Sequence, residues 1–210
     1  MDQLTHVAAI IALTMGAAWA SGINLYAAIF MLGIMGMTEG AQLPPGLEIL
    51  SHPAVLVAAG FMYVVEFVAD KVPGVDTGWD TLHTFIRIPA GAVLAAGAVG
   101  TVDPALTLAA ALVGGSVAAA SHAAKSGTRI LINTSPEPVS NWAASTAEDI
   151  GVVGGLWLAV YHPFVFLTLF VAFIAFVIWL LPRIWAGVKR IFRFLAGLFR
   201  TGNVPGGQGQ

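Results

Sequence analysis

The chain has 210 residues, of which 58% are hydrophobic and only 10% are charged, and its formal net charge is -2. A soluble domain carries about 25% charged residues, so this composition excludes an ordinary water-soluble globular protein. The mean hydropathy of +0.85 fits an all-α membrane protein with the lipid bilayer as its solvent and no nucleic-acid partner. The sequence contains no cysteine, which excludes disulfides and thiolate chemistry.

Six apolar segments have the length and composition that predict transmembrane helices. Proline at or near the start of several of them is typical of a helix N-terminus. Together the six segments predict one transmembrane domain over residues 1–182. In chain order they cover residues 4–37, 53–69, 82–99, 104–132, 139–160 and 164–181.

The first segment contains the stretch AWASGINLY, residues 18–26, which has two interpretations. Ala18-Trp19-Ala20 resembles the end of a cleavable secretory signal. However, the preceding MDQLTH has no Lys or Arg, whereas such signals normally start with positive charge. Cleavage would also leave an odd number of spans. We therefore interpret Ser21 to Asn24 as a polar interruption inside the membrane.

The basic residues predict the orientation of the chain. Residues 38–51, 100–103 and 161–163 contain no Lys or Arg, whereas the remaining connections have basic residues at or near their edges. Positive residues favour the cytoplasmic side. This pattern predicts a multi-pass protein of the bacterial inner membrane with both termini in the cytoplasm.

The carboxyl end has a different character. Five of the nine Lys and Arg residues lie in the last 28 positions. In residues 183–200, apolar side chains recur at helical spacing with basic residues between them, which predicts an amphipathic helix lying on anionic lipids of the inner leaflet. Residues 201–210 have the composition of a flexible tail.

The six segments divide into two sets of three, residues 1–100 and 101–182. Small transporters are often built from such inverted repeats, with helices broken near the bilayer centre. Residues 18–24 and 123–129 share three identities in seven positions, including Ser-Gly in both. This similarity predicts a 3+3 inverted repeat with helix breaks at Ser21-Gly22 and Ser126-Gly127.

Ionisable residues within the apolar segments are the main functional signal, because each costs about 2.5–3.5 kcal/mol on insertion scales and is therefore rare without a role. One group lies in EFVADKVPGVDTGWDTLHTFIR and a second in SHAAKSGTRILINTSPEPVSNWAASTAED. Their helical spacing places both groups on inward faces. We predict a substrate or ion pathway formed by Ser21, Asn24, Glu66, Asp70, Arg87, His122, Lys125, Arg129, Asn141, Glu148 and Asp149.

Three further residues are weak candidates for metal ligands: Asp76, Asp80 and His83. They form an incomplete set in a predicted loop, and no cofactor is predicted. For Lys71, Asp76 and Asp80, a solvated position among the lipid headgroups is the plainer expectation.

The stretches EFVADKVPGVDTGWDTLHTFIRIPAGA and HAAKSGTRILINTSPEPVSNWAASTAED together resemble an uncharacterised bacterial membrane family, the domain-of-unknown-function 4126 group. The resemblance extends over nearly the whole chain except the tail. It implies an integral membrane protein and supplies no activity or catalytic residue.

These patterns favour a small secondary transporter or channel for a small solute or ion. One alternative is an enzyme that acts on a lipid phosphate, with Arg87, Lys125 and Arg129 holding the phosphate and Mg²⁺ bound near Asp76 and Asp80. The other is a membrane scaffold whose ion pairs only fix the helices. The sequence leaves homo-oligomerisation open.

Overall fold

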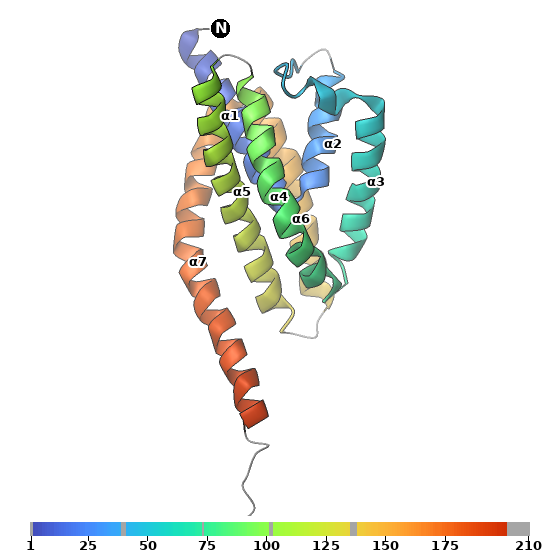
Figure 1. Cartoon of the computed structure of the whole chain (residues 1–210), viewed down its shortest axis with the longest axis vertical. Coiled ribbons are helices and arrows are strands. Elements are labelled where there is room, and N and C mark those ends of the chain that lie inside the picture. The colour runs from blue at the N-terminus through green and yellow to red at the C-terminus, as the bar shows by residue number, and fades with distance from the viewer. Residues whose placement is uncertain (1, 39–40, 73, 101–102, 135–137, 201–210) are drawn as a thin grey trace, which may run out of the picture.

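The computed structural model describes residues 2–38, 41–72, 74–100, 103–134 and 138–200, and within these ranges every regular element is a helix (Figure 1). The all-α prediction is therefore confirmed. The tail predicted at 201–210 lies outside the described residues. The elements are α1 (Gln3–Ile23), α2 (Leu25–Gly36), η1 (Glu48–Ser51), α3 (Pro53–Ala69), α4 (Val75–Val99), α5 (Pro104–Ile132), α6 (Pro138–Tyr161) and α7 (Pro163–Arg200).

Asn24 breaks the first apolar segment into two helices. Its backbone is extended (φ -145°, ψ 96°), and it ends α1 and begins α2. The Asn24 side-chain oxygen accepts a hydrogen bond from the backbone N–H of Ala27 at 2.9 Å, which is the interaction of an N-cap. The expected interruption is present, and the helix break falls at Asn24, whereas Ser21-Gly22 remains helical.

The break sends the chain back toward the end of the bundle at which α1 began (Figure 1). Residues 41–44, which follow α2, line a cavity together with His6 and Ala9 near the start of α1. From there α3, α4, α5, α6 and α7 alternate in direction, so α7 ends at the opposite end of the bundle from the N-terminus. Because α2 returns, the start of α1 and the end of α7 lie at opposite ends of the bundle, and the prediction that both termini are cytoplasmic is not confirmed.

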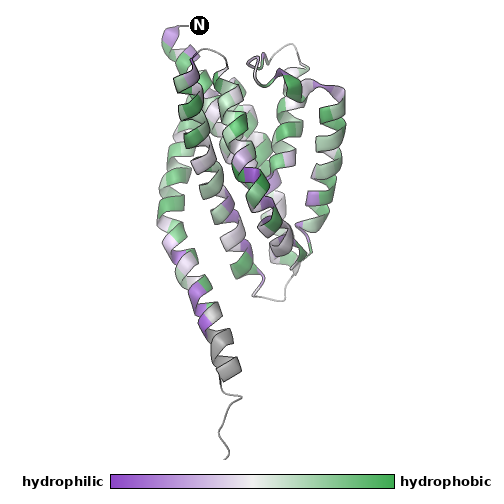
Figure 2. Ribbon diagram, viewed as in Figure 1, coloured by the Kyte–Doolittle hydropathy of each residue, from purple (hydrophilic) through white to green (hydrophobic). Residues whose placement is uncertain are grey.

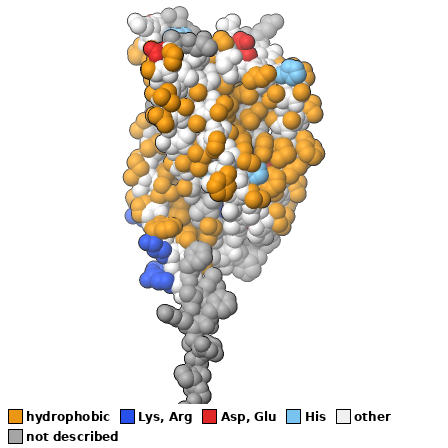
Figure 3. All heavy atoms as spheres, in the orientation of Figure 1, with side chains coloured by type: hydrophobic (Ala, Val, Ile, Leu, Met, Phe, Trp, Pro, Cys, Tyr) orange, Lys and Arg blue, Asp and Glu red, His pale blue; other side chains and the backbone are white. Residues whose placement is uncertain are grey.

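Among the described residues, four helices are long and apolar enough to cross a membrane: Gln3–Ile23, Val75–Val99, Pro104–Ile132 and the Pro163–Ile191 part of α7. Two shorter apolar helices, α2 and α3, accompany them. The six predicted spans are therefore not confirmed as six crossings. Hydrophobic side chains cover the flank of the bundle (Figure 3), and the exposed large apolar residues include Phe61 (68%) and Phe85 (82%). A multi-pass membrane protein follows from these surfaces.

Small residues let α1, α4 and α5 approach each other closely. A side chain at Gly22 would overlap with Ser121 and the Ala118 carbonyl of α5, and one at Gly114 would overlap with Ala95 of α4. Because lipid gives apolar helices no hydrophobic reason to associate, such close contacts are a main source of stability in membranes.

The carboxyl-terminal helix does not divide at Pro182. α7 runs without a break from Pro163 to Arg200, so the predicted separate helix over residues 183–200 is the end of a longer one. Ile184 and Val188 are buried, and Ile184 packs on Gly127 of α5. This contact requires glycine at 127. The beginning of the predicted surface helix is therefore held against the bundle.

The structure does not support the inverted repeat. α1 and α5, which would begin the two halves, run in the same direction (Figure 1). α5 is continuous through Ser126-Gly127, so no helix break occurs there. The Ser-Gly dipeptide that occurs in both α1 and α5 has a different packing role in each helix. Gly22 of α1 allows close contact with α5, and Gly127 of α5 allows close contact with α7.

Candidate functional site

Eight buried or half-buried ionisable side chains meet between α3, α4, α5 and α6, and we call this set the charged cluster. The hydrophilic parts of these helices lie toward the end of the bundle where α7 becomes basic (Figure 2). Seven members are at most 5% exposed, and only the Glu148 side chain, at 19%, is more open. The charged cluster consists of Glu66, Asp70, Asp76, Asp80, Arg87, Lys125, Arg129 and Glu148.

Arg87 joins α3 to α4. Its Nη2 forms an ion pair with Glu66, and its Nη1 donates to Asp80 Oδ1 at 2.9 Å. Asp80 lies seven residues before Arg87, which is two helical turns on the same face of α4. The Arg87 backbone carbonyl in turn accepts a hydrogen bond from Ser21 of α1 at 2.9 Å. Both side chain and backbone of Arg87 thus fix α4 against its neighbours.

Lys125 occupies the centre of the charged cluster. Its Nζ lies 2.7 Å from Asp70 Oδ2 and 3.4 Å from Glu148 Oε2. It also donates to the backbone carbonyl of Ile23 at 3.0 Å, at the last residue of α1. One ammonium group therefore connects α3, α6 and the break between α1 and α2.

Arg129 lies one turn further along α5 and holds α6. Its Nη2 pairs with Glu148 Oε2 at 2.8 Å, and its Nη1 donates to Asn141 Oδ1 at 2.6 Å. The same Nη1 donates to the backbone carbonyl of Asp70 at 3.1 Å. Arginine suits this position because its planar guanidinium can serve several acceptors at once.

Two polar pairs lie beside the charged cluster. Asn24 donates to Asp149 Oδ1 at 3.0 Å, so the residue that breaks the first helix also contacts α6. Lys71, in the turn after α3, lies over the Phe67 ring and donates to Ser145 at 3.4 Å. Burial lowers the pKa of the Lys71 ammonium.

The expectation that Lys71, Asp76 and Asp80 are solvated is wrong, because they are 8%, 0% and 1% exposed.

His122 completes the contacts of Arg87. Arg87 Nη1 donates to His122 Nδ1 at 3.3 Å, and His122 Nε2 lies 2.7 Å from the Thr84 hydroxyl. Because arginine has only donors, Nδ1 is the acceptor and the ring in this arrangement is neutral.

The weak metal candidates are hydrogen-bonded to neighbouring protein groups. Asp76 accepts hydrogen bonds from the Asn133 side chain at 2.8 and 3.0 Å, and His83 contacts Tyr26 and the Trp79 carbonyl through its two ring nitrogens. Across the described residues, no group of three or more His, Cys, Asp or Glu side chains has metal-binding geometry. Asp80 instead accepts from Arg87, inside α4 and not in a loop.

The structure brings every residue of the predicted pathway into one connected region. Sequence reasoning missed the ion-pair role of Asp76 and Asp80, although the spacing of Asp80 and Arg87 on one helix face was a usable signal. The contribution of the Ile23 carbonyl has no such signal, because any residue supplies a carbonyl and only the break exposes it.

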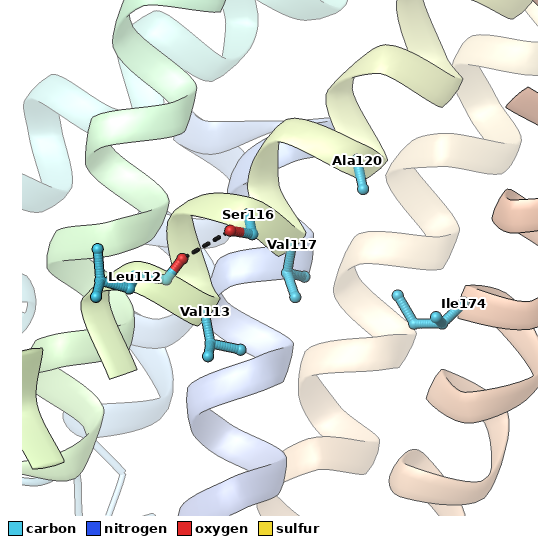
Figure 4. A pocket seen from close by; sticks show the side chains of 6 residues that line it. All are labelled: Leu112, Val113, Ser116, Val117, Ala120 and Ile174. Carbon is cyan, nitrogen blue, oxygen red and sulfur yellow. Dashed lines mark hydrogen bonds between the residues drawn. The ribbon is translucent and has the colours of Figure 1, made fainter. Parts of the chain in front are cut away.

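Three cavities of the described residues lie away from the charged cluster. An open hollow of about 340 Å³ lies between α5 and α7 (Figure 4). The Ser116 hydroxyl, which lines this hollow, donates a hydrogen bond to the Leu112 carbonyl of the same helix at 2.8 Å. A second, of about 320 Å³, is lined by Trp19 and aromatic side chains of α7, and a third, of about 420 Å³, lies near His6. None of these three is lined by a charged-cluster residue, so the cluster is closed from them in this conformation.

Comparison with known families agrees with this architecture. Residues 11–183 match the family described as Domain of unknown function (DUF4126), so the chain belongs to that family. The resemblance inferred from the two polar stretches is confirmed. Neither the curated proteins nor the solved structures include a significant match.

Proposed function

We propose that this protein is a small secondary transporter or channel for a small solute or ion, with the charged cluster as its ion pathway. The observation that carries this proposal is the convergence of charged side chains from four helices on a broken helix inside an apolar bundle. Broken helices at membrane depth are typical of transporter binding sites, where unwound carbonyls and helix ends hold ions. Ser21, His122, Asn141 and Asp149 would support that pathway.

The same proposal includes an orientation and a lipid partner. The positive-inside rule places the basic end of α7, and with it the charged cluster, on the cytoplasmic side of the bacterial inner membrane. At this end Trp185, Lys189 and Arg193 line a hollow of about 470 Å³. Basic and aromatic groups in this arrangement suit the headgroups of anionic inner-leaflet lipids.

Glu148 is the residue through which ions would leave the charged cluster, because it is its most exposed member and contacts both Lys125 and Arg129. The test uses liposomes containing the full chain and a pH-sensitive dye, with proton, Na⁺ or K⁺ gradients and a panel of small anions and neutral solutes. We expect an ion- or solute-dependent flux, and we expect Glu148→Gln to reduce it at least about tenfold. The reason is that this substitution removes a charge-assisted contact in the charged cluster. Glu48→Gln is the matched control, since Glu48 is exposed in η1.

A membrane scaffold is the second candidate. It is favoured by the pairing of every cationic member of the charged cluster with a carboxylate within 4.0 Å and by the separation of the three cavities from the cluster. A scaffold predicts no flux above that of empty liposomes for the unmodified protein under any of these gradients. That result would remove the transport proposal.

A further inference from the structure

The environment of the Lys125 ammonium is that of a bound cation. Four side-chain oxygens and one backbone oxygen surround its nitrogen within 3.7 Å. They are Asp70 Oδ2 (2.7 Å), Ile23 O (3.0 Å), Glu148 Oε2 (3.4 Å), Glu66 Oε1 (3.6 Å) and Asp80 Oδ1 (3.7 Å).

The backbone oxygen in this set is available only because the helix breaks. In a continuous helix the Ile23 carbonyl would accept a hydrogen bond from the N–H of Ala27. That N–H instead donates to the Asn24 side chain, so the Ile23 carbonyl is free to face Lys125. The carboxyl end of α1 also carries the negative end of the helix dipole, which favours a cation at this point.

Two independent observations indicate that this region carries an excess of negative charge. Glu66 Oε2 and Asp70 Oδ1 are buried without a hydrogen-bond partner, and both residues are at most 2% exposed. In addition, carboxylates outnumber cationic groups in and beside the charged cluster. The six carboxylates are Glu66, Asp70, Asp76, Asp80, Glu148 and Asp149, and the four cations are Lys71, Arg87, Lys125 and Arg129. An excess of buried negative charge is costly unless protons or cations compensate it.

We propose that the Lys125 ammonium occupies an alkali-cation site at the break between α1 and α2, and that Na⁺ or K⁺ can fill this site when the ammonium is absent. This inference rests on the proposed transport function.

The charged and titratable groups around Lys125 come from α3, α4, α5 and α6. They are Glu66 and Asp70 of α3 and its cap, Asp80 and Arg87 of α4, His122 and Arg129 of α5, and Glu148 and Asp149 of α6. Arg87 and Arg129 are held by their own acceptors, so the oxygens facing Lys125 keep their positions when the lysine side chain is shortened.

The site can be tested without transport, by measuring the melting temperature of the purified full chain in detergent. NaCl, KCl and choline chloride are compared at equal ionic strength. Lys125→Ala empties the site, and we expect Na⁺ or K⁺ to raise its melting temperature by roughly 3 °C or more relative to choline, because a ligand that binds only the folded state stabilises it. The unmodified protein and Lys71→Ala, which removes a buried lysine outside the site, should melt at the same temperature in all three salts.

Lys125→Ser is measured in parallel in case Lys125→Ala does not fold. A melting temperature that does not differ between alkali and choline chlorides in the folded variant would overturn the proposal. Failure of both variants to fold in any salt would also overturn it, since a free cation would then not replace the ammonium. Alkali stabilisation of Lys125→Ala without flux from the unmodified protein in liposomes would leave the site standing and remove the transport function.

Discussion

The two halves of the bundle are held together by different forces. In the half that contains the N-terminus, Leu32 and Leu156 are fully buried in a core that also includes Leu13 and Ala98. In the other half, Arg87 and Arg129 are the largest fully buried side chains, and ion pairs replace apolar packing.

This difference has a physical consequence. Apolar side chains gain little by leaving lipid for protein, so the apolar half depends on close fit. Buried charges must have partners, and removing one partner leaves the other uncompensated. We therefore expect damage in the charged half to cost more than damage of similar size in the apolar half.

The largest effect is expected for Arg87→Met, which keeps much of the side-chain volume and removes the charge. Glu66 and Asp80 would then be buried without their main partner, at a cost of about 3–5 kcal/mol. Thermal unfolding in detergent measures this loss. The control is Arg193→Met, because Arg193 is exposed on α7; equal melting temperatures of the two variants would show that the ion pairs of Arg87 do not stabilise the fold.

A smaller effect is expected in the apolar half for Leu156→Ala. The substitution removes packing at a fully buried position and leaves a cavity, at a cost of about 2–4 kcal/mol. Leu169→Ala is the matched control, since Leu169 is 54% exposed on the lipid-facing side of α7. A loss for Leu156→Ala greater than that for Arg87→Met would reverse the proposed difference between the two halves.

The smallest effect is expected for two glycines, one in each half. A side chain at Gly127 would overlap with Ile184 and separate α7 from α5, so Gly127→Ala should cost about 1–3 kcal/mol. Gly154 has no atom within 4 Å of such a side chain, and Gly154→Ala should be neutral or stabilise α6 by up to about 1 kcal/mol. Similar melting temperatures for both variants would contradict the packing role of Gly127.

The sequence alone determined the solvent and six of the eight members of the charged cluster. A chain with 10% charged residues has too few to cover a water-exposed surface, so the bilayer follows from composition. The helical spacing of His122, Lys125 and Arg129 places them on one face, and the cost of charge in lipid turns that face inward. Both inferences need only the residue composition, the helical spacing and the free-energy cost of placing a charge in lipid.

The tertiary structure alone decided the direction of the chain and the partners of each charge. Asn24 is compatible with a kinked span or with a return, and only the packing of α2 against η1 and α3 selects the return toward the end at which α1 began. Gly127 could break a helix or admit a neighbour, and only the position of Ile184 decides between these roles. Such choices depend on contacts between segments distant in the chain, and the local pattern of residues does not specify them.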